Sequence, residues 1–232
     1  MLSKELQWLE EHFPNLNYDE TTTILSGNID FVATYNLDND QFLILFPGVA
    51  NTIGGVTLSG KYSIKIEKPL SNFQLPRLYV EEDRGKYYSD RHLNGDGTAC
   101  LCGPLEEANY AKVGLSFPEF LASLVIPFLY GQIYYDTYHK WPWKEYSHGE
   151  IGALESYLAS QDELIVEPCL KQLKAGKNWS AIKLLLTQKS EIKGHTACIC
   201  EKKDHIRRCH PEIWRALNKL RNAVKKKVLD IL

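Results

Sequence analysis

The stretch Leu58-Ser-Gly-Lys-Tyr-Ser-Ile-Lys-Ile-Glu67 decides the fold class, because apolar and polar residues alternate along it. Alternation with a period of two is the pattern of a β-strand that buries one face. The same pattern occurs at residues 29–35, and short apolar stretches at residues 41–46 and 75–80 are also typical of strands. We therefore expect residues 29–80 to form a four-stranded antiparallel meander.

Helical signals flank the strands on both sides. Before them, Leu2, Leu6, Leu9 and Phe13 recur at spacings of four, three and four residues. This spacing predicts an amphipathic helix that ends before Pro14. One helix followed by antiparallel strands and further helices is an α+β arrangement.

The C-terminal half has helical signals throughout. Ser116-Phe-Pro-Glu119 and Ser147-His-Gly-Glu150 both have the form of a capping box. The first is expected to open a helix that Pro127 kinks, and the second a helix to about residue 160. The remaining predicted helices are at residues 165–188, with an interruption near Gly176, and after Pro211.

Composition narrows the class of protein. The chain has 232 residues, of which 44% are hydrophobic and 24% charged, so it suits one well-filled core with an appendage, or two small domains. Disorder and repeat architectures are poor descriptions of this composition. No apolar run reaches the roughly 18 residues of a membrane span, and the N-terminus has no signal-peptide pattern, so we expect a cytoplasmic protein without membrane contact.

The net charge of −2 hides an asymmetry. Residues 198–232 contain ten Lys and Arg against four Asp and Glu, a formal charge of +6 that leaves −8 for the rest of the chain. The six cysteines are also uneven, at positions 100, 102, 169, 198, 200 and 209. In a chain without a secretion signal, cysteines serve as metal ligands or nucleophiles before disulfides.

Residues 81–104 have neither a helical nor a strand period, and they contain Cys100. A thiolate is a strong nucleophile, and its thioester transfers an acyl group readily to an amine. A glycine-rich coil would leave such a thiol exposed, and the Asn94 amide could donate a hydrogen bond to the oxyanion that forms. Cys102 is either a resolving thiol or a residue without a role.

His148 is a second candidate. At the first turn of the predicted helix, the macrodipole favours a neutral imidazole ring. That ring could accept a proton from an attacking amine, or it could instead fix the corner at Trp141 and Trp143 by a hydrogen bond.

The C-terminal segment carries a metal-site pattern. Cys198-x-Cys200 is followed after eight residues by Cys209-His210, which gives two pairs of ligands. Four S and N donors suit tetrahedral zinc, and a small module of this kind depends on its ion for folding. We expect a structural Zn²⁺ ion on Cys198, Cys200, Cys209 and His210, with His195 or His205 as the rival to His210.

The order of these parts resembles the ubiquitin-conjugating enzymes over about residues 1–160. The matching motif is His92-Leu-Asn-Gly-Asp-Gly-Thr-Ala-Cys-Leu101, in which Leu93 replaces the family's Pro and Asn94 lies two residues closer to the cysteine. This compact form, with the later Trp141-Pro-Trp-Lys-Glu-Tyr-Ser-His-Gly149 stretch, is more similar to the prokaryotic relatives. The metal segment resembles the SEC-C zinc motif, although Glu201-Lys-Lys203 stands where that family has Gly-Ser-Gly.

The resemblance implies a function. Cys100 would receive the C-terminus of a ubiquitin-like protein, or of a cGAS-like nucleotidyltransferase, from an activating enzyme and pass it to an amine, in a bacterial antiphage defence operon. His92 would brace the loop by hydrogen bonds, as its counterpart does in the family. The predicted domains are a conjugating-enzyme-like (UBC) domain at 1–162, a helical connector at 163–194 and a zinc module with a terminal helix at 195–232.

A different function is a non-catalytic binding module with the same fold. Its basic zinc tail would dock a protein or nucleic-acid partner. The cysteine at the motif position argues against this function.

Overall fold

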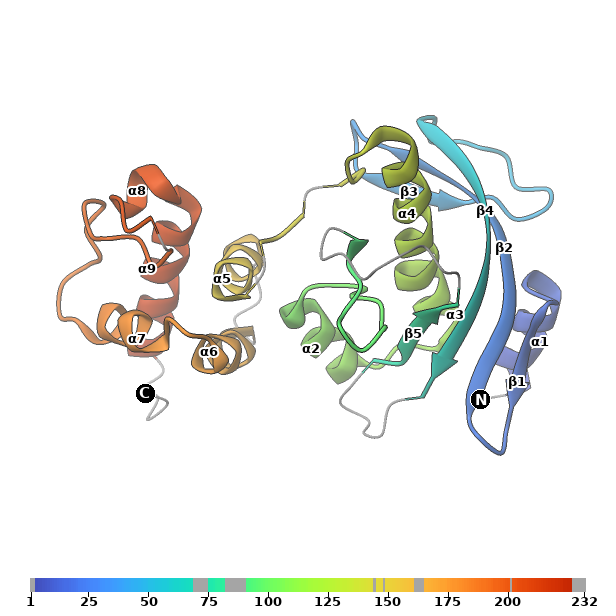
Figure 1. Ribbon diagram of the computed structural model, residues 1–232, viewed down its shortest axis with the longest axis horizontal. Helices are drawn as coiled ribbons and strands as arrows, with labels where there is room; N and C mark the ends of the chain where they lie inside the picture. Colours follow the sequence, from blue (N-terminus) through green and yellow to red (C-terminus); the bar gives the residue numbers. More distant parts are fainter. Residues whose placement is uncertain are drawn as a thin grey trace. The chain divides into compact units, whose positions relative to one another are not determined.

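The structure is a computed structural model that describes residues 3–68, 75–81, 91–143, 145–147, 149–160, 165–200 and 202–226 (Figure 1). It confirms the α+β class, with an N-terminal helix α1 (Ser3–His12), an antiparallel sheet and C-terminal helices. The chain divides into two compact units. The first comprises Met1–Cys102 and Tyr110–Glu145, and the second comprises Gly103–Asn109 and Tyr146–Leu232.

The sheet of the first unit is built on two long strands. β2 (Ile24–Asn36) and β4 (Val56–Glu67) pair antiparallel over residues 24–35 of β2, and β5 (Arg77–Val80) pairs with β4. β1 (Leu16–Asp19) pairs with the first part of β2 and β3 (Gln41–Ile44) with its last part. Because β4 occupies one edge of β2, the two short strands share the other edge.

The four predicted strands are present as β2, β3, β4 and β5, but they do not pair in chain order as a meander would. The antiparallel path is β1-β2-β4-β5, and β3 lies off this path at the edge of β2. Residues 41–46 were expected between their neighbours in the sheet, but the chain returns from β3 to pair with the opposite edge of β2. β1 was not predicted, because four residues after Pro14 are too few to show an alternating pattern.

The apolar face of the sheet is buried as the alternation predicts. On β4, Tyr62, Ile64 and Ile66 are almost fully buried, while the intervening Ser63 and Lys65 are partly exposed. The buried face meets α4 (Ile126–Tyr138), which lies alongside the sheet in Figure 1. A side chain at Gly60 of β4 would collide with Ile133 of α4, so the two elements approach closely there.

The helix that begins after Ser116 has the predicted capping box. The Ser116 hydroxyl accepts from the Glu119 N–H, and the Glu119 carboxylate accepts from the Ser116 N–H. The helix continues as α3 (Phe117–Phe120), the π-helical segment η2 (Leu121–Val125) and α4. Since Pro127 has no N–H and its ring crowds the preceding turn, the wider π turn lies directly before it, where the sequence predicts a kink.

The second unit has one helical core. It contains α5 (Gly149–Ala159), α6 (Val166–Ala175), α7 (Trp179–Thr187), α8 (Ile206–Cys209) and α9 (Pro211–Lys226). The interruption predicted near Gly176 separates α6 from α7. The unit includes α5, which packs against α6 and α9.

Two local predictions differ from the structure. The second capping box does not form, since the Ser147 N–H and hydroxyl both bond to Glu155 and the Glu150 carboxylate accepts from the Asn178 N–H. Helix α2 (Pro104–Val113) follows directly on the segment predicted to lack structure. Among the described residues, no helix combines the length and apolar character needed to cross a bilayer.

Candidate functional site

The segment before Cys100 is a short hairpin instead of the expected coil. Leu93 pairs with Ala99, and the Cys100 N–H donates to the His92 carbonyl over 2.7 Å. At the other end the Asn94 N–H donates to the Thr98 carbonyl over 2.8 Å. The hairpin places Cys100 directly opposite His92.

The hairpin extends the sheet. The Ala99 N–H donates to the Leu78 carbonyl of β5 over 2.8 Å, and Tyr79 pairs with Thr98. Cys100 therefore lies at the end of a strand that β5 holds in place.

Cys100 is a reduced, half-buried residue. Its Sγ lies 3.7 Å from the carbonyl oxygen of Cys102, a distance that suits a weak S–H hydrogen bond. Cys102 is half-buried and also reduced. This contact joins the Cys100 thiol to the Cys102 backbone, and the two sulfurs are not bonded to each other.

Asn94 lies in the turn of the hairpin. Its Nδ2 group donates to the Thr98 hydroxyl over 2.9 Å, and that hydroxyl donates to the Asp96 carboxylate over 2.6 Å. These bonds from Thr98 lower the pKa of the Asp96 carboxyl. One N–H of the Asn94 amide therefore closes the turn, and the amide carries a second N–H.

His92 is held on two sides. Its Nε2 lies 2.7 Å from Glu145 Oε1, and its ring stands edge-on to Trp141 with centroids 4.6 Å apart. The backbone of His92 is left-handed, with φ of 50°, which is uncommon for a residue with a side chain. The predicted candidate His148 lies outside the described residues.

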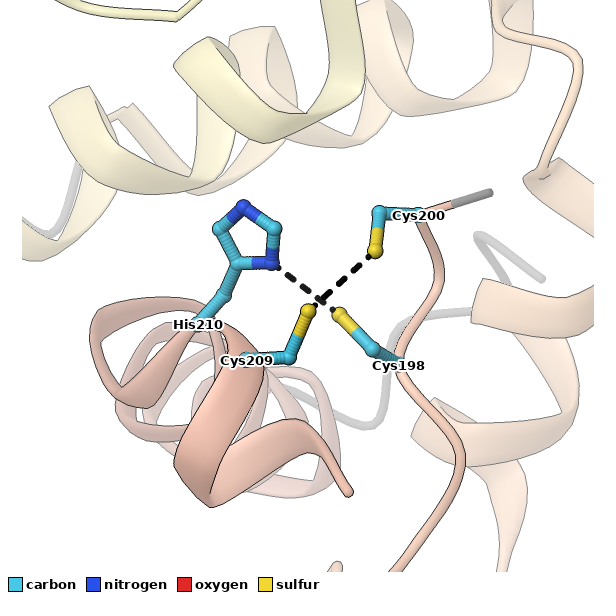
Figure 2. A group of neighbouring side chains, drawn as sticks. All are labelled: Cys198, Cys200, Cys209 and His210. Atoms are coloured by element: carbon cyan, nitrogen blue, oxygen red, sulfur yellow. Dashed lines mark hydrogen bonds between the residues drawn. The ribbon is translucent and has the colours of Figure 1, made fainter. Parts of the chain in front are cut away.

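The four predicted metal ligands come together in the second unit. Cys198 and Cys200 lie on a loop, Cys209 ends α8, and His210 stands between α8 and α9; Figure 2 shows their donor atoms pointing toward one another. Cys198 Sγ is 3.3 Å from His210 Nδ1, and Cys200 Sγ is 3.4 Å from Cys209 Sγ. All four donor atoms lie within 4.8 Å of one another.

These distances suit a tetrahedral ion. Zinc–sulfur bonds of about 2.3 Å at tetrahedral angles separate two sulfur ligands by about 3.8 Å. Three thiols and one imidazole are donors of the kind that zinc prefers. The rivals His195 and His205 are exposed and lie outside this group.

A small knuckle brings the two ligand pairs together. The Cys198 N–H donates to the Asp204 carbonyl over 2.7 Å, and the Ile206 N–H donates to the Thr196 carbonyl over 2.8 Å. Lys203 turns the chain with a left-handed backbone, at φ of 50°, so this turn forms without the glycines of the SEC-C pattern. Burial raises the pKa of the Cys198 thiol to about 12 in the metal-free protein.

Two basic residues of α9 bond to backbone carbonyls of neighbouring helices. Lys219 Nζ donates to the carbonyls of Tyr157 and Ser160 at the end of α5. Arg221, which is 4% exposed, donates to the carbonyls of Gln188 and Lys189 at the end of α7. These two cations stabilise helix ends, where the macrodipole favours positive charge.

In comparisons with known proteins, no protein-family model, no curated protein and no solved structure matches the chain significantly.

Proposed function

We propose that the chain is a cysteine-dependent transferase of the ubiquitin-conjugating type, with Cys100 as the acyl carrier. The observation that carries the proposal is the half-buried, reduced Cys100 at the end of a hairpin on the sheet edge. An N-terminal helix followed by an antiparallel sheet and further helices supports it, because the resemblance implies the same coarse order of elements.

The chemistry takes two steps. The Cys100 thiolate attacks the thioester between an activating enzyme and the C-terminus of its cargo, and the enzyme's thiolate leaves. An amine then attacks the new thioester, so that an amide forms, the carbon–sulfur bond breaks and the Cys100 thiol is regenerated. The cargo is a ubiquitin-like protein or a cGAS-like nucleotidyltransferase, in the setting of bacterial antiphage defence.

Asn94 and His148 are the proposed assisting residues. The second N–H of the Asn94 amide would donate to the oxyanion of each tetrahedral intermediate. His148 would accept the proton that the attacking amine loses. His92 contributes by holding the strand opposite Cys100.

The metal group has a separate role in this proposal. Cys198, Cys200, Cys209 and His210 would hold a structural Zn²⁺ ion, which leaves no ligand position for water and therefore no catalytic position. Elemental analysis of the purified protein should find about one zinc ion per chain. Cys209→Ser should lower this content, whereas Cys102→Ser should leave it unchanged.

The transferase is tested by trapping the thioester. The protein is co-expressed with the proteins encoded beside its gene and analysed by intact mass. We expect an adduct that thiol reagents release and that Cys100→Ala abolishes, and Cys100→Ser should give an ester that resists thiols. Cys102→Ala is the matched control and should keep the adduct. Full antiphage protection by Cys100→Ala would instead favour the non-catalytic binding module.

A further inference from the structure

The strand opposite Cys100 is fixed by a residue far away in sequence. Cys100 is held through its N–H, which donates to the His92 carbonyl over 2.7 Å. Any shift of the His92 backbone therefore moves the backbone of Cys100. What holds His92 in place determines where the thiol lies.

His92 needs stabilising contacts, because its backbone has an unfavourable left-handed conformation. A φ of 50° brings the side chain of an L-residue close to its own backbone, and Asn or Gly adopts this conformation more easily. The compensating contacts are the 2.7 Å bond to Glu145 and the edge-on packing against Trp141.

The preceding residue is anchored separately. The guanidinium of Arg91 pairs with Asp136 of α4, and the Arg91 carbonyl accepts from the buried Gln132 amide over 2.8 Å. The residue at which the hairpin begins is therefore anchored to α4. The Glu145 contact then fixes the position of the next residue, His92, which lies opposite Cys100.

Glu145 makes this contact near the surface. Its side chain is 43% exposed, against 19% for His92, so its replacement leaves no cavity in the core. A loss of the contact should therefore act on the hairpin with little effect on the stability of the unit.

We propose that Glu145 is a positioning residue for Cys100, which acts through the His92 ring. This inference rests on the proposed function for its catalytic meaning, but the geometry that it predicts is measurable without a cargo. Two backbone amides of the hairpin allow the effect on its geometry to be measured. The Cys100 N–H depends on His92, whereas the neighbouring Ala99 N–H donates to Leu78 of β5.

The test is amide hydrogen exchange of the full-length protein by NMR. Glu145→Ala should lower the protection of the Cys100 amide about fivefold, the effect of one lost hydrogen bond, and leave that of Ala99 unchanged. Glu145→Gln should restore it, since the Gln carbonyl oxygen still accepts from the imidazole. Asp30→Asn is the matched control, because it removes another half-exposed carboxylate of the same unit, which pairs with Lys61.

A second variant separates the ring contact from the backbone strain. His92→Asn tolerates the left-handed conformation but is too short to reach Glu145. We expect the Cys100 amide to lose protection here as in Glu145→Ala. Unchanged Cys100 protection in either variant, or an equal loss at Ala99, would overturn the proposal. Failure of the thioester trap with the wild-type chain would count against the transferase and not against this positioning role.

Discussion

Burial gives the cysteines of this chain different chemistry. Cys169 is fully buried in the helical core, and burial raises the pKa of its thiol to about 12. Cys100 and Cys102 are half-buried beside a turn. Because the thiolate is the nucleophile, a raised pKa and burial both suppress the reactivity of Cys169.

Iodoacetamide at pH 8 should distinguish these residues. At this pH, four units below its pKa, Cys169 is protonated, and we expect alkylation about a thousandfold slower than for an ordinary cysteine. Its reactivity should rise only as the pH approaches 12 or the unit unfolds. Peptide mapping by mass spectrometry measures each site, and labelling of Cys169 in the native protein at the rate of Cys102 would contradict the assignment.

Sequence spacing predicted the four residues that come together as a possible metal-binding group, but it did not predict the partner of His92. The two residue pairs are close in sequence, so a short loop can bring them together in only a few arrangements. Local spacing is therefore enough to predict the group. Glu145 is 53 residues from His92, and its role depends on how the chain returns after α4. Nothing in the sequence near Glu145 marks that contact.

At the scale of elements, α4 carries a glycine that the packing requires. Gly131 lies in the helix interior, where alanine would normally be favoured by about 1 kcal/mol. A Cβ atom there would stand 2.3 Å from the ring of Trp141 and 3.0 Å from that of Trp143. The Trp141 ring also packs against His92, so this close approach bears on the Cys100 hairpin.

Gly131→Ala should therefore destabilise the protein, by about 2 kcal/mol, since overpacking exceeds the gain in helix propensity. Urea unfolding monitored by tryptophan fluorescence measures the change. Gly95→Ala is the matched control, because no atom lies within 4 Å of the added carbon. A neutral or stabilising effect at Gly131 would show that the Trp141 ring can move aside at little cost.

The buried Arg221 offers a second test of an element. Replacement by Met keeps the apolar packing but removes the donors to the Gln188 and Lys189 carbonyls. We expect a loss of about 1 kcal/mol in the free energy of unfolding, because the Arg221 hydrogen bonds are lost while Lys225 Nζ still donates to both carbonyls. Lys226→Met on the exposed face of α9 should change it by less than about 0.5 kcal/mol. Equal effects of both substitutions would contradict the capping role.

Long periodic elements were predictable, and short ones depended on tertiary contacts. β2, β4 and α9 each present a full apolar face, and their patterns locate them. β1, α2 and the Cys100 hairpin are stabilised by partners instead, such as the pairing of β1 with Leu25 of β2. For α2, Pro104 and the acidic residues Glu106 and Glu107 are a start signal that the sequence contains.

At the scale of the whole molecule, the proposed zinc ion ties the knuckle to the second unit. A chelator should remove the ion and lower the melting temperature of this unit while the sheet of the first unit stays folded, because binding energy at such a site is folding energy. Far-UV circular dichroism should then show two transitions in place of one. Acidification should act in the same direction, since protons compete for the thiolates. A melting curve that EDTA leaves unchanged would contradict the metal site.

The path of the chain between the two units affects how the protein folds during its synthesis. Gly103–Asn109 belongs to the second unit, although the chain enters and leaves it from the first. Leu105 of this segment is 2% exposed, in one cluster with Leu154, Leu170 and Leu217. A growing polypeptide must therefore expose the chain up to Leu217 before Leu105 finds all of these neighbours. A nascent chain stalled at residue 145 would lack these neighbours, so the apolar side chain of Leu105 would be accessible to chaperones and to other unfolded chains.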